Sequence, residues 1–172
     1  NKKFLSLIMT FFMMCSIVAG TPMAARAEGT YDGEFNIEAE EGAGSGFRYE
    51  NGELWLDEDG TYLVYGDRNK VGKRIRVSAG VTATVTSKDI NLEINLPFEC
   101  GPNSNVTLIL ADDSENTFSS YGGHAGLRVD SSAVLTITTE GQSRGNGSLS
   151  AYGGADSSSS WASAGIGGSE SQ

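Results

Sequence analysis

The chain has 172 residues, a length that suits one domain. It carries 22 acidic and 12 basic side chains and a formal net charge of −10. Because nucleic-acid binding needs clusters of basic residues that contact phosphates, this charge balance argues against a nucleic-acid partner, whereas cations, including divalent metals, fit it.

The first 27 residues have the pattern of a secretory signal peptide. Two lysines precede the apolar run Phe4–Ala19, and Ala25–Ala27 places small residues at the −3 and −1 sites of a cleavage. A membrane-spanning helix is the alternative, but the apolar run is short for a span and is followed by Gly20 and Pro22. We expect cleavage after Ala27 and a secreted or cell-surface protein, without membrane insertion after cleavage. Cleavage removes three basic residues and no acid, which takes the net charge from −10 to −13.

The mature chain is expected to begin with an acidic, glycine-rich leader, residues 28–46, in which residues 35–37 (FNI) are able to add an edge strand. A β-domain is expected over residues 47–172. Its first ten residues, FRYENGELWL, contain two alternating runs joined by Asn51-Gly52, the strongest short-range signal for a tight hairpin. This hairpin is positioned to cover one end of a repeated core. A further strand is expected at residues 61–65 (TYLVY), and residues 66–73 are interpreted as a polar connection.

Residues 75–168 repeat one pattern three times and begin it a fourth time. Each copy has a short apolar start, a polar turn, an alternating strand, a polar loop and a shorter apolar strand. The copies start at Ile75, Phe98, Leu127 and Ile166, at intervals of 23, 29 and 39 residues. Variable intervals around a constant strand pattern are typical of a solenoid whose insertions lie in loops outside the stack.

Alternation along these strands assigns every second residue to the core. The inward residues are aligned as three sets, namely Val81/Ala83/Val85, Val106/Leu108/Leu110 and Ala133/Leu135/Ile137. Outward residues are expected to form a column of alternating charge and two hydroxyl columns, since stacked strands favour matched neighbours on one face. The charge column is Arg76, Glu99 and Arg128, and the hydroxyl columns hold Thr82/Thr107 and Thr84/Thr136.

The pattern therefore predicts an all-β protein built as a parallel β-helix, or β-solenoid, with an N-terminal hairpin cap. A leucine-rich repeat would show a fixed Leu and Asn spacing, which the sequence lacks. A β-sandwich stays open as the alternative, because short strands with frequent turns occur there too. It does not, however, predict matched residues at every third strand. Because AGIGG at 164–168 opens a new copy and no polar cap follows it, we expect the natural chain to continue beyond Gln172.

Several segments together resemble one known family. The order TYLVYG (61–66), RIRV and VTATVT (74–86), NVTLILADDSENTF (105–118), AGLRV (125–129) and AGIGG (164–168) is similar to the carbohydrate-binding β-helix domain of exported bacterial surface proteins. The similarity covers about residues 47–168. It implies a right-handed parallel β-helix that binds plant-type or other acidic polysaccharide without cleaving it, in some members with calcium.

The aromatic residues expected on the surface give a candidate carbohydrate-binding site. Tyr121 and Tyr152 close the matched segments TFSSYGG and SLSAYGG, and alternation turns both outward in adjacent copies, about 4.8 Å apart. Trp161 lies in the serine-rich loop 153–165. These three residues form the candidate site. The alternative interpretation of the tyrosines is an aromatic ladder that only stabilises the stack.

The candidate metal ligands are Asp112, Asp113 and Glu115, because carboxylates crowded into one turn suit calcium. A solvated acidic turn is the alternative, since the EF-hand spacing is absent. His124, the sole histidine, is expected to be exposed, and Cys100 to behave as a small core residue.

No catalytic residues are predicted. The sequence has no recognisable Ser/His/Asp triad pattern, no His or Cys cluster with metal-ligand spacing and no phosphate-binding loop. Its outward strand positions hold mainly Thr, Ser and Asn rather than the carboxylate pairs that glycosidases use. We therefore expect a non-catalytic polysaccharide-binding protein. A structural stalk within a larger surface protein is the main rival, and a polysaccharide lyase or glycosidase is the third interpretation.

Overall fold

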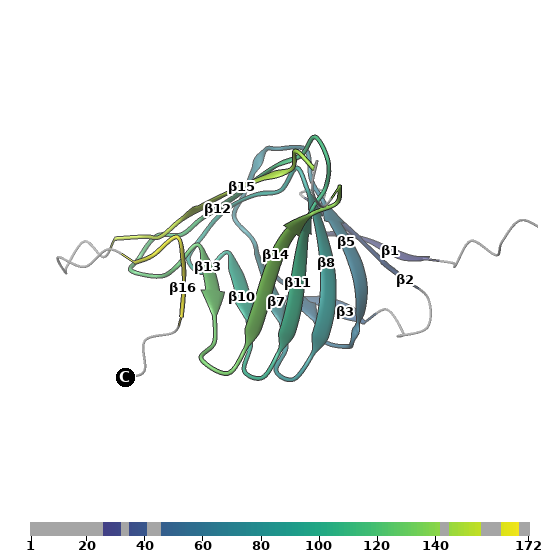
Figure 1. Ribbon diagram of the computed structural model, residues 1–172, viewed down its shortest axis with the longest axis horizontal. Coiled ribbons are helices and arrows are strands. Elements are labelled where there is room, and N and C mark those ends of the chain that lie inside the picture. Colours follow the sequence, from purple (N-terminus) through teal and green to yellow (C-terminus); the bar gives the residue numbers. More distant parts are fainter. Residues whose placement is uncertain (1–25, 32–34, 41–45, 142–144, 156–162, 169–172) are drawn as a thin grey trace, which may run out of the picture.

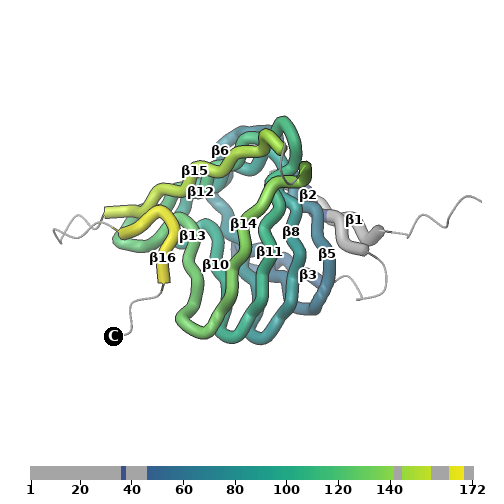
Figure 2. The backbone as a smooth tube through the Cα atoms, in the orientation of Figure 1, coloured from purple at the N-terminus to yellow at the C-terminus, as the bar shows by residue number. Residues whose placement is uncertain are grey.

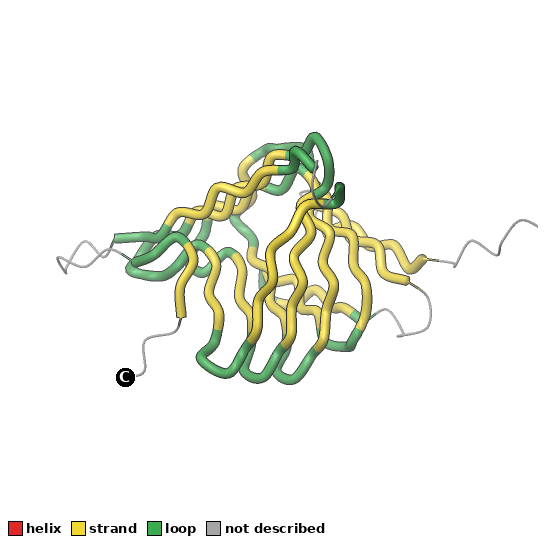
Figure 3. The backbone as a smooth tube through the Cα atoms, viewed as in Figure 1, coloured by secondary structure: helices red, strands yellow, loops and turns green. Residues whose placement is uncertain are grey.

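The structure, a computed structural model, describes residues 26–31, 35–40, 46–141, 145–155 and 163–168. These residues form strands and loops and no helix, so the all-β prediction is confirmed (Figure 3). The strands are β1 (Arg26–Tyr31), β2 (Phe35–Glu40), β3 (Phe47–Glu50), β4 (Glu53–Leu56), β5 (Gly60–Tyr65), β6 (Lys70–Val71), β7 (Arg74–Val77), β8 (Thr82–Lys88), β9 (Asn91–Glu93), β10 (Phe98–Cys100), β11 (Asn105–Leu110), β12 (Glu115–Ser119), β13 (Leu127–Val129), β14 (Val134–Thr139), β15 (Ser148–Tyr152) and β16 (Ile166–Gly168).

The strands form three sheets. Sheet 1 has the order β1-β2-β5-β8-β11-β14, sheet 2 the order β16-β13-β10-β7-β4-β3, and sheet 3 the order β15-β12-β9-β6. From β4 onward the chain visits sheets 2, 1 and 3 in turn, and each strand lies parallel to its counterpart from the previous visit. We call one such visit to all three sheets a circuit. Figure 2 shows successive circuits side by side, with β16 beginning another.

The circuits start earlier than the sequence pattern predicts. β4 pairs with β7, β5 with β8 and β6 with β9, all in parallel, so residues 53–71 already form a circuit. β6 has two residues, of which Val71 is buried and Lys70 exposed. Because one apolar residue gives no alternation, the sequence pattern predicts a polar connection here and not a strand.

The register predicted for sheet 2 is confirmed. Phe98 pairs with Ile75 on one side and with Leu127 on the other, and Leu127 pairs with Ile166. The first three of these residues are at most 1% exposed. Their next residues along the chain point outward and fall into the predicted charge column of Arg76, Glu99 and Arg128.

The register predicted for sheet 1 is wrong by two residues. Leu108 lies between Val85 and Ile137, and not between Ala83 and Leu135 as aligned above. A shift of two residues keeps each side chain on the same face of a strand. The prediction that Leu108 is in the core therefore holds, and its side chain is fully buried.

The physical reason for this error is a serine in the core. Asn105 pairs with Thr82, which brings Ser104 to the inward position beside Val81. Ser104 is 1% exposed, and its hydroxyl has no hydrogen-bond partner among the described residues. A polar residue at an inward position breaks the apolar alternation, so the alignment moved to the next apolar residue, Val106. The hydroxyl columns change accordingly, and Thr61, Thr84, Thr107 and Thr136 form one column.

Two antiparallel hairpins extend the sheets beyond the first circuit (Figure 1). β3 and β4 are joined by Asn51 and Gly52, whose φ angles of 51° and 83° suit a type I′ turn, so the predicted hairpin is confirmed. β2 pairs with β5, and its Ile37 is fully buried, so residues 35–37 do add a strand. The predicted signal peptide lies outside the described residues, apart from its last two, Arg26 and Ala27, which begin β1.

The core lies between the three sheets and consists of their inward side chains. The Phe98 and Phe118 rings, from sheets 2 and 3, are stacked with centroids 5.4 Å apart and planes 19° apart. Phe47 and Tyr49 of β3 pack against the same core. The largest fully buried side chains are Tyr62, Phe98, Phe118, Ile37, Leu54, Leu56, Ile75, Ile90, Leu92, Leu108 and Leu127.

Tyr62 places a phenol hydroxyl inside the first circuit. Its Oη lies 2.6 Å from the Glu58 carbonyl and 3.0 Å from the Gly46 carbonyl. Replacing Tyr62 with Phe removes the donor from these carbonyls and is expected to lower the free energy of unfolding by about 1–2 kcal/mol, measured by urea denaturation. Equal stability of the two proteins would show that this hydrogen bond contributes nothing.

The same residue predicts a dependence on alkaline pH. Burial, and after it the charge of Glu58, raises the pKa of Tyr62 above its ordinary value of 10.0. A raised pKa means that the folded state holds the proton more tightly, so this contribution is complete below about pH 10 and is lost as the pH rises through the folded-state value. The advantage of the wild type over Tyr62→Phe should therefore shrink above pH 10. An advantage that stays constant up to the alkaline limit of folding would contradict this.

Candidate functional site

Tyr121 and Tyr152 lie on the outward side of sheet 3. Tyr152 is the last residue of β15, and Tyr121 follows the end of β12 by two residues. Alternation around the buried Phe118 turns Tyr121 outward, and the two tyrosines are 53% and 57% exposed. The prediction that both are exposed on the same sheet is confirmed. We call the outward side of sheet 3 around them the tyrosine face.

The two tyrosines are diagonal neighbours, and the prediction that they are directly adjacent is wrong. Tyr152 pairs with Ser119, while a Cβ built on Gly154 would lie 2.4 Å from the Tyr121 Cα, which places Gly154 next to Tyr121. With strands about 4.8 Å apart and about 6.6 Å per two residues, the diagonal Cα separation is about 8 Å. This offset disfavours a stacked ladder that only supports the fold, and it leaves both rings open to solvent.

An asparagine in the core explains the misalignment. The sequence match of TFSSYGG with SLSAYGG sets Phe118 opposite Leu149, but Phe118 pairs with Ala151, and Leu149 pairs with Asn116. Asn116 is 1% exposed. Because this inward position is polar, the sequence pattern gave no signal that the strand begins there.

Apart from the two tyrosines, the tyrosine face is polar from β6 to β15. Lys70, Asn91, Thr117 and Ser150 form one column across the four strands. The next column holds Glu93, Ser119 and Tyr152, and the Lys70 ammonium is ion-paired with the Glu93 carboxylate. Hydroxyl and amide groups that donate and accept hydrogen bonds therefore lie beside two exposed aromatic rings.

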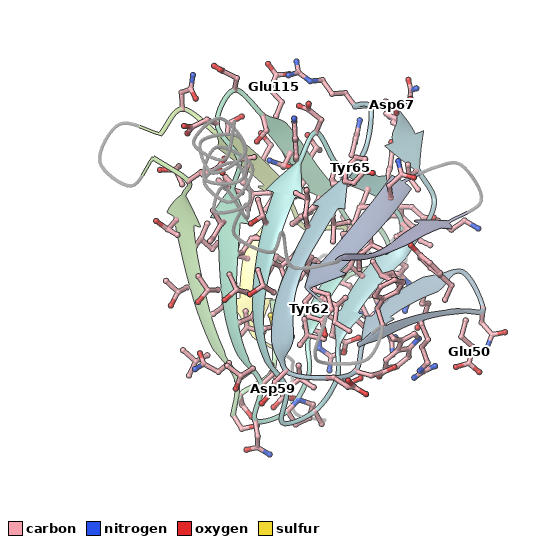
Figure 4. The ribbon with its side chains drawn as sticks, turned by 90° about the vertical axis from the view of Figure 1, so that its right-hand side faces the viewer. Glu50, Asp59, Tyr62, Tyr65, Asp67 and Glu115 are labelled. Atoms are coloured by element: carbon pink, nitrogen blue, oxygen red, sulfur yellow. The ribbon has the colours of Figure 1, made fainter. Side chains whose placement is uncertain are left out.

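The predicted metal ligands lie in the loop between sheets 1 and 3. Asp112 and Asp113 are exposed in the turn after β11, and Glu115 begins β12. Asp113 adopts a left-handed φ of 57°, its backbone N–H donates to the Asn146 side-chain oxygen at 2.7 Å, and its carboxylate accepts from the Asn146 amide. In Figure 4, Glu115 and Asp67 of the first circuit both lie at the upper end of the view.

Arg68 of the first circuit contacts acidic residues of the next two circuits at this end. Its Nε donates to the Asp89 carboxylate at 2.8 Å, one terminal nitrogen donates to the Asp113 carbonyl at 3.1 Å, and the other lies 3.3 Å from the Glu115 carboxylate. The hydrogen bond to Asp89, and then the charge of Asp89, raises the pKa of Arg68. The sequence gives no indication of this contact, because Arg68 is 45 residues from Asp113.

Two of the three predicted metal ligands thus have partners within the protein. Among the described residues, no group of three or more His, Cys, Asp or Glu side chains is arranged to hold a metal ion. Calcium would have to compete with Asn146 for Asp113 and with Arg68 for Glu115. The calcium site stays a prediction.

The charge column of sheet 2 is a network of ion pairs. Arg76 Nε lies 3.1 Å from carboxylate oxygens of both Glu53 and Glu99, and Arg128 lies 3.4 Å from Glu99. The Arg76 guanidinium also lies 5.0 Å from the centroid of the Trp55 ring, and Arg48 covers that ring at 4.6 Å. Because these arginines are paired with neighbouring acids, this column mainly serves the stack of circuits.

His124 is exposed, as expected. Cys100 is fully buried, and burial raises the pKa of its thiol to about 12, which leaves it a core residue rather than a nucleophile. Trp161 lies outside the described residues.

Comparisons with known proteins add no relative. No family model, curated protein or solved structure matches this chain. The function must therefore be argued from the geometry. Within the described ranges, the structure has no helix that is long and apolar enough to cross a membrane.

Proposed function

We propose that this chain is a right-handed parallel β-helix that is exported and binds an extracellular polysaccharide without cleaving it. Three sheets that the chain visits in a fixed order, with parallel pairing between successive circuits, support the β-helix interpretation over a sandwich. In a sandwich, consecutive strands usually pair antiparallel. The signal-peptide pattern of residues 1–27 supports export.

The tyrosine face is the observation that carries the proposal. Tyrosine combines an apolar ring with a polar hydroxyl and is enriched at interfaces, so two exposed tyrosines on one face support a binding surface. Tyr121 and Tyr152 are each more than half exposed, and they are about 8 Å apart on the diagonal. Their rings can pack against the apolar C–H faces of sugar rings, while Thr117, Ser119 and Ser150 hydrogen-bond to sugar hydroxyls. Trp161 is the proposed third aromatic residue of this surface.

A polymer suits this surface better than a small sugar does. The stack repeats similar positions at a fixed interval, so a repeating ligand makes several weak contacts whose sum gives useful affinity without a deep pocket. The charge of the chain bears on the kind of polymer. An acidic polymer would be repelled by the net charge of −13 expected after signal cleavage, and Arg76 and Arg128 are already paired with Glu99. We therefore propose that the polymer is neutral. An acidic polymer would bind only with a bridging calcium ion near Asp112, Asp113 and Glu115.

Retention on insoluble polysaccharides tests the proposal. The purified protein is mixed with cellulose, pectin and mucin, with calcium and with a chelator, and the bound fraction is measured. The wild type should be retained on at least one polymer. Tyr121→Ala/Tyr152→Ala should bind about thirtyfold more weakly, because each of the two aromatic contacts contributes roughly 1 kcal/mol. Adding Trp161→Ala should weaken retention further.

A matched control is Val134→Ala, which removes a side chain that is 57% exposed on sheet 1. Retention of this variant should equal that of the wild type. If the tyrosine double variant is retained as well as the wild type, the site lies elsewhere. If the wild type binds none of the polymers, a structural stalk becomes the better interpretation. Retention that requires calcium would identify an acidic polymer.

A further inference from the structure

The outward side of sheet 1 is rich in threonine over four strands, and its charge is confined to Lys88 at the end of β8. Outward positions in β5, β8, β11 and β14 that are paired number thirteen, and seven of them are threonines. The others are Leu63, Asn105, Ile109, Val134 and, as the last pair at the end of β5 and β8, Tyr65 and Lys88. One residue in five of the whole chain is charged, so a face of this size with its single lysine at one end is unusual for this protein. We call the eleven positions other than Tyr65 and Lys88 the threonine face.

The threonines of this face are regularly spaced. Thr61, Thr84, Thr107 and Thr136 are successive partners across all four strands. Thr82 and Thr86 flank Thr84 in β8, and Thr138 follows Thr136 in β14. Neighbouring positions are therefore about 4.8 Å apart across the strands and about 6.6 Å apart along them. Figure 4 looks towards these strands, with Asp59 near one end of β5 and Tyr65 at the other.

The composition of the face limits the ligand that fits it. An ion or a charged polymer would find no counter-charge among the eleven residues, since Lys88 lies beyond them at one end. A sugar ring would find an aromatic side chain only at that end, where Tyr65 pairs with Lys88, because none of the eleven residues is aromatic and Tyr121 and Tyr152 lie on sheet 3. Each threonine offers a hydroxyl that both donates and accepts, beside a methyl group. The complementary ligand is therefore neutral, donates and accepts equally, and is itself periodic.

We propose that the threonine face binds ice. Solid water meets all three requirements, since its surface is a neutral lattice of alternating hydrogen-bond donors and acceptors. Threonine hydroxyls take places in that lattice, and the methyl groups between them order the adjoining water, because water around small apolar groups loses orientational freedom. Neither property depends on the tyrosine face, so this activity is independent of the proposed polysaccharide binding.

Rigidity is what makes such a face effective. The β-branched threonine side chain has a restricted χ1 angle, and parallel pairing on both sides fixes the backbone of β8 and β11. Little conformational entropy is then lost when the face meets a lattice. Each contact is weak, but many are made at once, which gives stable attachment.

Partition into growing ice tests the proposal. Purified protein is frozen slowly as a polycrystalline ice shell, and its concentration in the ice is compared with that in the remaining liquid. The gap between freezing and melting temperatures is measured alongside. The wild type should be enriched in the ice and should widen the gap. Thr107→Lys, which places a long charged side chain in the middle of the face, should lower the enrichment roughly tenfold or more, because the many contacts are no longer made together.

The matched control is Thr117→Lys, since Thr117 is likewise a partly exposed residue of a paired strand, but on sheet 3. It should enter ice as the wild type does, and both variants should unfold within a few degrees of the wild type by circular dichroism. Exclusion of the wild type from ice, like an ordinary protein, would overturn the proposal. An equal loss of ice uptake in both variants would also overturn it. The same holds if Thr107→Lys lowers retention on microcrystalline cellulose but leaves uptake into ice unchanged. Loss of polysaccharide retention in Tyr121→Ala/Tyr152→Ala with unchanged ice uptake would show that the two sites are separate.

Discussion

Replacing Leu108 with Ala is expected to lower the free energy of unfolding by about 2–5 kcal/mol, the range for removing a buried leucine and leaving a cavity. Leu108 is fully buried in β11 between Val85 and Ile137. Because the strand has paired neighbours on both sides, its backbone cannot easily move inward to fill the space. Urea denaturation followed by circular dichroism measures the loss.

The neighbouring Thr107→Ala is the control for this prediction. Thr107 points outward from the same strand and is partly exposed, so its truncation is expected to cost well under 1 kcal/mol. Equal losses from the two substitutions would mean that the inward and outward faces of β11 have been exchanged. The comparison tests the core of sheet 1 without depending on any proposed ligand.

Replacing Asn116 with Ala is expected to cost about 2–4 kcal/mol, although it removes few apolar contacts. The Asn116 carbonyl accepts hydrogen bonds from the Ser87 hydroxyl at 2.7 Å and from the Ile90 N–H at 3.2 Å. Its amide donates to the Ser114 hydroxyl at 3.0 Å and to the Ser148 carbonyl at 3.2 Å. Truncation leaves several buried polar groups without partners, and each such group costs roughly 1–3 kcal/mol.

This asparagine connects three circuits, since its partners lie in the circuits before and after its own. Its removal should therefore also reduce the steepness of the unfolding transition, because neighbouring circuits become less tightly coupled. Asn105→Ala is the matched control, since Asn105 is exposed. Denaturation midpoints of the two variants that coincide would refute the structural role of Asn116.

The sequence was sufficient for the features that depend on apolar alternation. The starts of the copies at Ile75, Phe98, Leu127 and Ile166 are aligned in sheet 2 as predicted, because each begins with a large apolar residue. The Asn51-Gly52 turn was predictable because few residues tolerate positive φ at both central positions of a type I′ turn.

The errors occur where polar residues occupy the core. Ser104 and Asn116 both point inward, and each shifted the predicted register by two residues. An apolar pattern cannot identify such positions, because the buried side chains are polar. Asn116 is buried with hydrogen bonds to another circuit, whereas the Ser104 hydroxyl has no partner among the described residues. The exposed face of each strand was still correct, because a shift of two residues preserves it.

Contacts between residues far apart in the chain also could not be predicted from the sequence. Arg68 contacts Asp89 and Glu115, and Arg76 covers Trp55, only because successive circuits bring these residues side by side. Charge and aromatic content show that such pairs are possible, but only the register selects them. The acidic turn illustrates this, since two of its three carboxylates have partners that the sequence did not indicate.

The central claim, that polysaccharide lies across the tyrosine face, is tested most directly by oxidative footprinting of the bound protein. Hydroxyl radicals label exposed side chains, and mass spectrometry reports the labelling of each residue with and without the retaining polymer. We predict that Tyr121 and Tyr152, which are 53% and 57% exposed in the free protein, become protected, while Val134 on sheet 1, also 57% exposed, keeps its labelling. Protection of Val134 with unchanged labelling of both tyrosines would contradict the claim.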